Sequence, residues 1–315
     1  MVSATAPVHK PVMLAECLKG LHPSAGDLMV DCTFGRGGHS LAILGRLGVE
    51  GRLLALDKDL EAVCSSEALT LSADSRFNLV HGSFASLKQQ VERLGWLGKV
   101  GGILMDLGVS SPQLDRAERG FSFLRDGPLD MRMNSTQGET AAEWLASVSE
   151  QDLADVLYQY GEERFSRRIA HSIVTQRVRK PIYRTSDLVR IIEEVVPKRE
   201  KGKHPATRSF QAIRIRVNRE LDELESGLTQ ALEVLKPGGR LVVISFHSLE
   251  DRIVKRFMRD QERGWCAGDS RHLIQQPETS LLRRVGAALK PDEMELKANV
   301  RSRSAVLRVA EKKEW

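Results

Sequence analysis

Glycines and acidic side chains stand where a nucleoside could be bound. Gly35 and Gly37 lie between a short apolar run at 28–30 and a helical pattern at 41–47, which predicts a strand, a turn and a helix. Glycine lets the main chain approach a ligand closely. Asp57 ends the next apolar run, where a carboxylate can accept hydrogen bonds from both hydroxyls of an adenosine ribose. The alternative is a plain tight turn, with Asp57 capping a helix.

Another acid, Asp106, ends the apolar run at 101–105 and helps to distinguish between two adenosine-containing cofactors. A dinucleotide needs a helix N-terminus for its pyrophosphate, whereas S-adenosylmethionine has no phosphate and needs carboxylates for its amino and ribose groups. Asp31 and Asp57 also follow predicted strands. The pattern therefore favours S-adenosylmethionine and methyl transfer over a nicotinamide-dependent oxidoreductase.

A parallel sheet would bring these acids to one edge, because its strands end together and ligands bind at their carboxyl ends. Strands are predicted at 28–30, 52–57, 76–84, 101–108, 240–246 and 304–309. One helix is predicted at 13–21, before the first strand, and others between the strands at 41–47, 62–71 and 87–94. The result is an α/β fold with a doubly wound, mostly parallel sheet.

The middle of the chain has a different pattern. A long irregular stretch at 116–133 precedes predicted helices at 140–147, 150–159, 162–179 and 185–196. An amphipathic helix then begins at Phe210 and continues to the Lys236–Gly239 turn. We expect one domain from 1–115 and 207–315, interrupted by an inserted helical substrate-recognition domain at 116–206.

Composition narrows the class of protein. The chain has 315 residues, of which 41% are hydrophobic and 28% charged, as is ordinary for a globular protein. No apolar run approaches the ~18 residues of a membrane span, and residues 1–10 do not resemble a signal peptide. We expect a cytoplasmic protein that does not engage a membrane. Its four cysteines and eight histidines show no metal-ligand spacing, so we expect neither a disulfide nor a metal site.

The net charge of +5 is distributed unevenly. Lys198, Arg199, Lys203 and Arg208 lie in one basic region, and smaller clusters occur at 283–284 and 301–303. Such clusters indicate a polyanionic partner, and the alternative is a set of solvated charged surfaces. The sequence leaves the oligomeric state open, with a homodimer as one expectation.

Several long motifs resemble one family. They are His9–Val12, Asp31–His39, Asp106–Asp115, Arg119–Phe123, Gly127–Met133, Tyr160–Arg164 and Ser245–Arg252. Together they resemble the RsmH (MraW) family of bacterial 16S ribosomal RNA cytosine-N4 methyltransferases, over residues 9 to 310. The resemblance implies a class I methyltransferase (Rossmann-like) fold with a helical insertion, and 16S ribosomal RNA, within the small ribosomal subunit, as the partner.

The resemblance also assigns cofactor contacts. It places Gly37, Gly38 and His39 on the glycine turn, Asp57 on the ribose and Phe84 beside the adenine, with Asp106 and Gln113 near the remaining cofactor surface. Phe84 as ordinary core and Gln113 as a brace for its loop are the alternatives.

The family substrate is a cytosine in the decoding region, whose exocyclic amine is a poor nucleophile and must be oriented toward the methyl group. Other amino-methyltransferases use an Asp-Pro-Pro-Tyr loop after the fourth strand, but this chain has Ser110-Ser111-Pro112-Gln113 there. We name Asp106, Ser111 and Pro112 as candidate catalytic residues. The departure from the carboxylate pattern disfavours a DNA amino-methylase and leaves the orienting group open.

The target base must leave its stack, and aromatic side chains commonly hold such bases. Trp144 is the first candidate, followed by Phe165 and Phe123, with core packing as the alternative for each. The basic region from Lys198 to Arg208 would bind phosphates. A rival of another class is a non-catalytic RNA-binding assembly factor that keeps the cofactor pocket as a relic.

Overall fold

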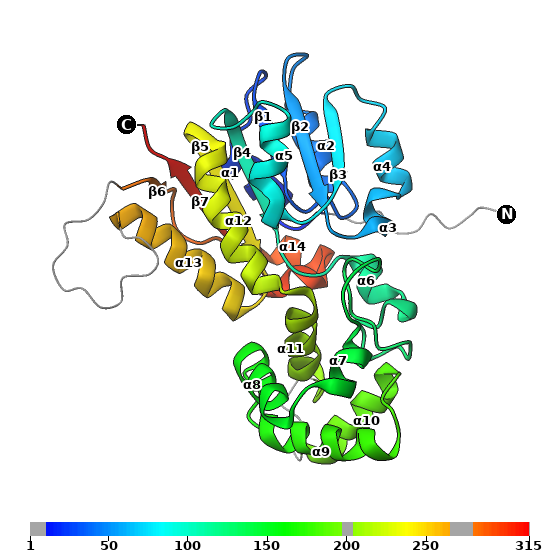
Figure 1. Cartoon of the computed structure of the whole chain (residues 1–315). Coiled ribbons are helices and arrows are strands. Elements are labelled where there is room, and N and C mark those ends of the chain that lie inside the picture. The colour runs from blue at the N-terminus through cyan, green and yellow to red at the C-terminus, as the bar shows by residue number, and fades with distance from the viewer. Residues whose placement is uncertain (1–10, 197–203, 265–279, 315) are drawn as a thin grey trace. The chain divides into compact units, whose positions relative to one another are not determined.

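Seven strands form one sheet within the part of the chain that this computed structural model describes, residues 11–196, 204–264 and 280–314. Their order is β3-β2-β1-β4-β5-β7-β6 (Figure 1). The strands are β1 Leu28–Asp31, β2 Arg52–Asp57, β3 Phe77–His81, β4 Val100–Asp106, β5 Leu235–Ser245, β6 Leu282–Arg284 and β7 Val306–Lys312. Strands β1 to β5 pair in parallel, and β7 pairs antiparallel with β5 and β6.

Strand order reverses between β1 and β4. From β1 the chain continues to β2 and β3 on one side, whereas β4 continues to β5 on the other. In open α/β sheets this reversal leaves a crevice outside the carboxyl ends of the two strands, where ligands bind. The predicted parallel sheet is confirmed, and the structure adds β6, which is too short to give a periodic signal.

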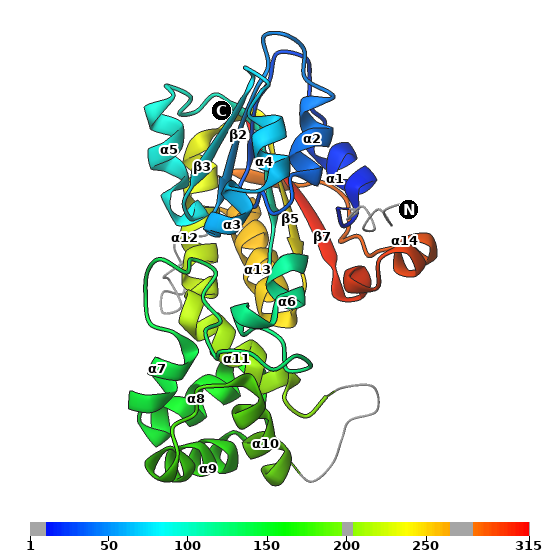
Figure 2. The same ribbon diagram turned by 90° about the vertical axis from the view of Figure 1, so that its right-hand side faces the viewer.

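Helices cover both faces of the sheet (Figure 2). One face carries α1 Leu14–Leu21, α2 Gly38–Leu44, α3 Leu60–Val63 and α4 Ser66–Leu71, which contribute side chains to one hydrophobic cluster. The other carries α5 Leu87–Arg93, α12 Glu220–Val234 and α13 Ser248–Arg263, which contribute to a second cluster. A short helix, α14 Glu293–Ala298, precedes β7.

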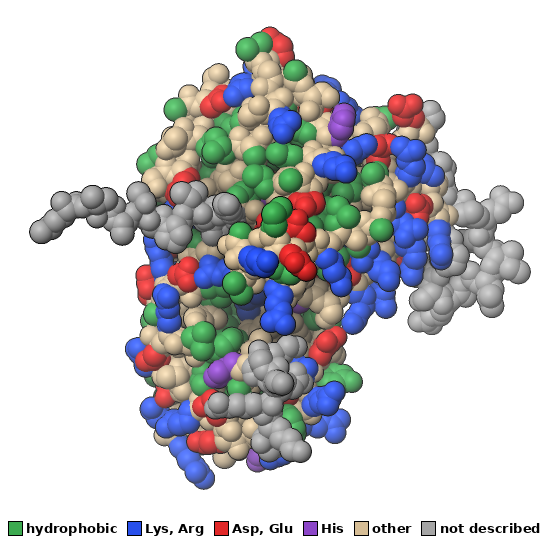
Figure 3. Space-filling model, turned by 180° about the vertical axis from the view of Figure 1, so that it is seen from behind, with side chains coloured by type: hydrophobic (Ala, Val, Ile, Leu, Met, Phe, Trp, Pro, Cys, Tyr) green, Lys and Arg blue, Asp and Glu red, His purple; other side chains and the backbone are tan. Residues whose placement is uncertain are grey.

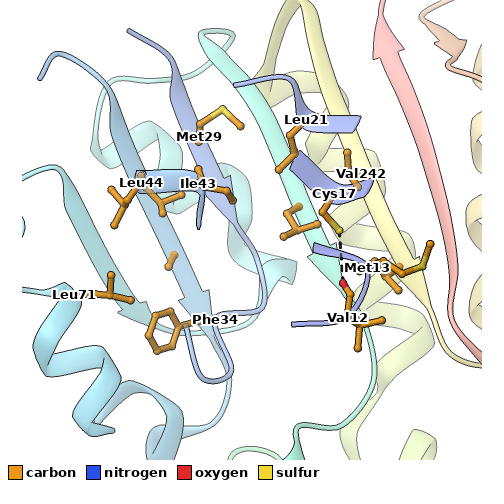
Figure 4. Close-up of a cluster of buried hydrophobic side chains, with 14 of the residues drawn as sticks. Val12, Met13, Cys17, Leu21, Met29, Phe34, Ile43, Leu44, Leu71 and Val242 are labelled. Carbon is orange, nitrogen blue, oxygen red and sulfur yellow. Dashed lines mark hydrogen bonds between the residues drawn. The ribbon is translucent and has the colours of Figure 1, made fainter. Parts of the chain in front are cut away.

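Alternation along the strands creates the two clusters. In β1, Met29 belongs to the first cluster and Val30 to the second, and in β4 Leu104 and Met105 divide in the same way. Successive side chains of a strand point to opposite faces of the sheet. A nearly continuous apolar run therefore contributes side chains to the hydrophobic cluster on each face. Figure 4 shows the first cluster, where Cys17 of α1 packs beside Val242 of β5.

The chain divides into two compact units, Met1–Gly108 with Asp222–Trp315, and Val109–Leu221. We call them the sheet unit and the helical unit. The helical unit contains α6 Ser111–Asp115, α7 Ala141–Ser147, α8 Glu150–Gly161, α9 Ser166–Arg179, α10 Thr185–Val195 and α11 Thr207–Asn218. It has its own core, with Trp144, Leu157 and Ile213 among the buried residues. Both of its boundaries lie outside those of the predicted insertion, 116–206.

The irregular stretch at 116–133 is held by hydrogen bonds to its own backbone and to α11. The guanidinium of Arg119 donates to the carbonyls of Arg132 and Met133, each at 3.0 Å. Asn218 donates to the Met131 carbonyl at 2.7 Å and accepts from the Met133 amide at 2.7 Å. These bonds fix a long segment that has little secondary structure of its own.

Two predicted helices are each divided in the structure. Instead of one helix from Phe210 to the turn at 236, the structure has α11 and α12 separated by Arg219, whose φ of 53° is left-handed. The bonds of Asn218 hold the end of α11, and Arg214 binds Glu220 across the break with two 2.8 Å bonds. The predicted helix at 62–71 is likewise two helices, because Ser65 caps α4 through the Ala68 amide.

None of the helices in the described residues has the length and apolarity that a bilayer crossing requires.

Candidate cofactor-binding edge of the sheet

Three carboxylates lie at the carboxyl edge of the sheet, at the ends of neighbouring strands. Asp31 ends β1, Asp57 ends β2 and Asp106 ends β4. β1 pairs with both β2 and β4, so its end lies between the other two. This is the arrangement that the sequence predicted. The three acids differ in the donors from which their carboxylate oxygens accept hydrogen bonds.

Asp31 braces the glycine turn. It is fully buried, and its Oδ1 accepts a bond from the Thr33 amide at 3.1 Å while its Oδ2 accepts from the Ser40 hydroxyl at 2.7 Å. Burial raises the pKa of this carboxyl, and the nearby His39 and the Ser40 hydroxyl oppose that effect. Because Asp31 is fully buried and both of its oxygens have partners, it connects β1 to α2 and positions the turn between them, whereas the half-buried Asp57 remains accessible to a ligand.

Asp57 fixes the first glycine of the turn. Its Oδ2 accepts from the Gly35 amide at 2.7 Å and its Oδ1 from the Asp59 amide at 2.7 Å. Burial raises the pKa of Asp57 to about 6, although both backbone bonds favour the charged form. Gly35 has a φ of +56°, and a Cβ built there would meet only the Thr33 carbonyl, at 4.0 Å. Here the main chain is open to a ligand.

Gly37 and Gly38 must be glycine because there is no room for a side chain, and not because a ligand approaches the main chain there. A Cβ on Gly37 would lie 2.8 Å from both Leu71 and Phe34, and one on Gly38 would lie 2.6 Å from Pro11. Side chains at these positions would therefore collide with the core, and the left-handed φ of +72° at Gly37 is a further constraint. The glycine pattern pointed to Gly35 and Gly37, and the family resemblance to Gly37 and Gly38; of these three positions, only Gly35 has open space for a ligand.

His39 and Asp106 form an incompletely bonded pair. His39 Nε2 lies 3.5 Å from Asp106 Oδ2, and the Asp106 amide donates to the Thr33 hydroxyl at 2.8 Å. Burial lowers the pKa of His39, but the carboxylates of Asp106 and Asp31 outweigh burial and raise it. In the described part of the chain, His39 Nε2 and Asp106 Oδ1 are buried without a hydrogen-bond partner.

Unpartnered polar atoms concentrate at this edge. Five buried side-chain nitrogen or oxygen atoms of the described residues have no hydrogen-bond partner, and four belong to His39, Asp106, Ser245 and His247. Ser245 ends β5, beside β4. His247 caps α13, and its Nε2 lies 3.1 Å from Glu250 Oε1, so this carboxylate is a polar partner for it and the atoms left for a ligand are those of His39, Asp106 and Ser245. Buried polar groups are normally satisfied, so a concentration of exceptions indicates a place where a ligand supplies the partner.

Phe84 follows β3 and is half-buried against the second hydrophobic cluster. A Cβ on Gly227 of α12 would lie 2.8 Å from the Phe84 ring, so the ring packs directly against that glycine. Nearby, Glu223 of α12 accepts a bond from Ser83 and one from Lys58, each at 2.7 Å. Sequence reasoning missed Glu223 and Gly227, because the fold joins them to residues more than a hundred positions away.

The other candidates for catalysis and cofactor binding lie on α6 of the helical unit. Ser111 and Pro112 open this helix. Gln113 is buried and closes a capping box with Ser110, whose amide donates to its side-chain oxygen at 2.9 Å. Gln113 therefore braces its own loop, which was the alternative to a cofactor contact.

The aromatic candidates differ in exposure. Trp144 is only 4% exposed, belongs to the core of the helical unit and lies under Arg216, which favours core packing over base binding. Phe165 is half-buried with Arg168 over its ring, and Phe123 is covered by a stacked His204. Arg208 lies half-buried on α11. The predicted phosphate ligands Lys198, Arg199 and Lys203 lie outside the described residues.

The sheet, with its antiparallel β7, and the acids at the ends of β1, β2 and β4 define a class I methyltransferase whose cofactor is S-adenosylmethionine. Asp106 Oδ1 and the open backbone at Gly35 fit such a cofactor, which offers amino and hydroxyl donors and no phosphate. The confirmed predictions are therefore the fold class and the cofactor.

The chain belongs to the MraW methylase family, whose model matches residues 6–313. It is 61% identical over 302 residues to a protein of Methylococcus capsulatus named ribosomal RNA small subunit methyltransferase H, covering 96% of this chain and 99% of that protein. A protein of the same name from Alteromonas mediterranea is 53% identical over 306 residues, covering 96% and 97%. The family resemblance of the sequence motifs is thereby confirmed.

Proposed function

We propose that this protein transfers the methyl group of S-adenosylmethionine to the exocyclic N4 of a cytosine in the decoding region of 16S ribosomal RNA. The names of the two relatives support ribosomal RNA of the small subunit as the substrate. The motifs from Asp106 to Asp115 and from Ser245 to Arg252 support the choice of base and atom, through their resemblance to the family. The partner in this proposal is the small ribosomal subunit, in the cytoplasm.

The observation that carries the cofactor half of the proposal is the unpartnered Asp106 Oδ1 at the topological switch point. Leaving a buried acceptor unsatisfied costs roughly 1–3 kcal/mol, and more for a charged group. A ligand amine that donates to Oδ1 would recover this free energy. Asp57 would accept from ribose hydroxyls, Gly35 would let the backbone approach, and Phe84 would lie beside the adenine.

S-adenosylmethionine supplies an electrophilic methyl group when it is bound. The protein's task is then to hold the cytosine amine, because its lone pair is delocalised into the ring and attacks only from a suitable orientation. Well-oriented reactants gain up to about 7–11 kcal/mol from positioning, so fixed acceptors for the two amine protons would account for much of the catalysis. Ser111, Pro112 and Asp106 are the groups that we propose for this role.

Methyl transfer can be tested on isolated ribosomal subunits. Labelled S-adenosylmethionine is incubated with small and large subunits that lack the modification, and the RNA is purified before counting. The proposal predicts label in the small-subunit RNA only. Tight cofactor binding without label in either RNA would contradict the proposed reaction and favour the non-catalytic assembly factor.

A further inference from the structure

Helix α13 exposes a row of basic side chains on its solvent side. Its apolar side packs on the sheet through Val254 and Met258, which are buried. Lys255, Arg256 and Arg263 are exposed. Residues seven apart share one side of a helix, so Arg256 and Arg263 project together from the side away from the core, and Lys255 lies on the adjoining exposed surface.

The acids of the same helix are already engaged. Asp251 binds Arg308 at 2.7 and 3.0 Å, Asp260 binds Arg259 at 2.7 Å, and Glu262 binds Arg284 at 2.5 Å. The fourth acid, Glu250, is 2% exposed and accepts from the Phe246 amide at the start of the helix. Each acid of α13 is therefore committed to a partner within the sheet unit.

The exposed cations have no such partners. Among the described residues, none forms a hydrogen bond or ion pair with Lys255, Arg256 or Arg263. Ordinary solvated surfaces mix charges of both signs, so three unneutralised cations on the exposed surface of one helix indicate an anionic partner. We call these three residues the α13 basic row.

The helix that carries the row starts near the carboxyl edge, and Lys255, the first residue of the row, lies seven residues beyond the first residue of α13. Ile244 of β5 pairs with Asp106 of β4, and α13 starts at Ser248. At a rise of about 1.5 Å per residue, Lys255 and Arg263 lie about 12 Å apart along the helix. β6 packs against α13 and carries Arg283, whose side chain is 65% exposed and is paired with Glu311 at 2.5 Å, so Arg283 is not counted in the row. Figure 3 shows Lys and Arg side chains gathered toward the side of the sheet unit where β6 and β7 lie.

We propose that the α13 basic row binds backbone phosphates of the RNA substrate and so positions the strand that carries the target base. The proposal rests on the proposed function. Regularly spaced phosphates fit a row of cations better than a single acidic group does, and such contacts set register without reading sequence. RNA bound here would approach the carboxyl edge of the sheet along a helix that starts beside it.

The salt dependence of RNA binding tests the row. Lys255→Ala/Arg263→Ala removes two of its cations, and Lys19→Ala/Arg46→Ala removes an exposed Lys and an exposed Arg from the opposite helical layer as a matched control. Each phosphate contact with a single strand contributes about 0.7 to the slope of log affinity against log salt. We therefore expect the first variant to reduce that slope by about 1.4 and affinity at 0.1 M salt by on the order of tenfold. Cofactor affinity and the control should match the wild type.

Two outcomes would overturn the proposal. An unchanged slope in Lys255→Ala/Arg263→Ala, or an equal reduction in the control, would show that the row is not a specific RNA contact. If the wild type still methylates RNA, only the row is overturned, and an acidic protein becomes the partner to look for. If the wild type transfers no methyl group to RNA, the proposed function itself is wrong.

Discussion

His39 Nε2 lies 3.5 Å from Asp106 Oδ2, and both side chains keep a buried polar atom without a hydrogen-bond partner in the described residues. The two residues come from the first turn of α2 and from the end of β4, on either side of the switch point. Desolvation makes unpaired groups costly, so their persistence together indicates a site prepared for a polar ligand.

Asp106→Asn should weaken S-adenosylmethionine binding while leaving the fold intact. The amide has the shape of the carboxylate but lacks its charge, and a hydrogen bond to a charged group is worth roughly 1.5–3 kcal/mol. We expect a loss of affinity of roughly 10- to 100-fold by calorimetric titration. Asp155→Asn, at an exposed position on α8, is the matched control. Wild-type affinity in Asp106→Asn would remove this carboxylate from the cofactor site.

Cofactor affinity should depend on pH through Asp57. Burial raises its pKa to about 6, so the carboxylate gains a proton as pH falls through that value and loses acceptor capacity for ribose hydroxyls. Affinity should fall between pH 7 and 5, because the proton and the ligand compete for the same oxygens. In Asp57→Asn the affinity should be lower at pH 7 and flat across this range. An identical pH profile in the variant and the wild type would assign the titration to another group.

Gly227→Ala should disturb Phe84. The added Cβ would lie 2.8 Å from the ring, and overpacking of this kind typically costs about 1–3 kcal/mol, more than the ~1 kcal/mol that alanine gains in a helix. We expect a lower denaturation midpoint and weaker cofactor binding. Gly26→Ala, which adds a Cβ with nothing within 4 Å, is the control. Combining Gly227→Ala with Phe84→Leu should restore the midpoint, and failure to do so would place the strain elsewhere.

Trp144 and Phe165 should respond differently to substitution. Trp144→Ala removes a buried ring and should destabilise the protein by about 3–5 kcal/mol, whereas Trp144→Phe should keep most of the turnover on RNA. Phe165→Ala should raise KM for RNA with little loss of stability, since its ring is half-buried. Chemical denaturation and steady-state kinetics separate the two effects. A turnover defect in Trp144→Phe at wild-type stability would return Trp144 to the base-binding role.

Local patterns predicted the sheet well. The apolar runs that end at Asp31, Asp57 and Asp106 are nearly continuous, as buried parallel strands require, so the position of the acids followed from the strands themselves. The break at Arg219 escaped prediction, because apolar positions continue across it. What stops α11 is the bonding of Asn218 to Met131 and Met133, which are distant in sequence.

The sequence indicated which residues gather at the site, but it did not indicate which contacts each of them makes. Glycines at 35, 37 and 38 look alike in a sequence, but Leu71, Phe34 and Pro11 decide which of them has open space. The contact of His39 with Asp106 also depends on how β1 and β4 pair. Such distinctions arise from tertiary packing, which local sequence patterns do not report.

The identity of the methylated nucleoside tests the central claim most directly. Small-subunit RNA that has been treated with the protein and S-adenosylmethionine is digested to nucleosides, and the methylated product is compared by mass spectrometry and retention with authentic methylcytidines. The account predicts N4-methylcytidine from a decoding-region fragment, formed by the wild type and sharply reduced with Asp106→Ala. A methyl group on another atom, on another base or outside the decoding region would contradict it.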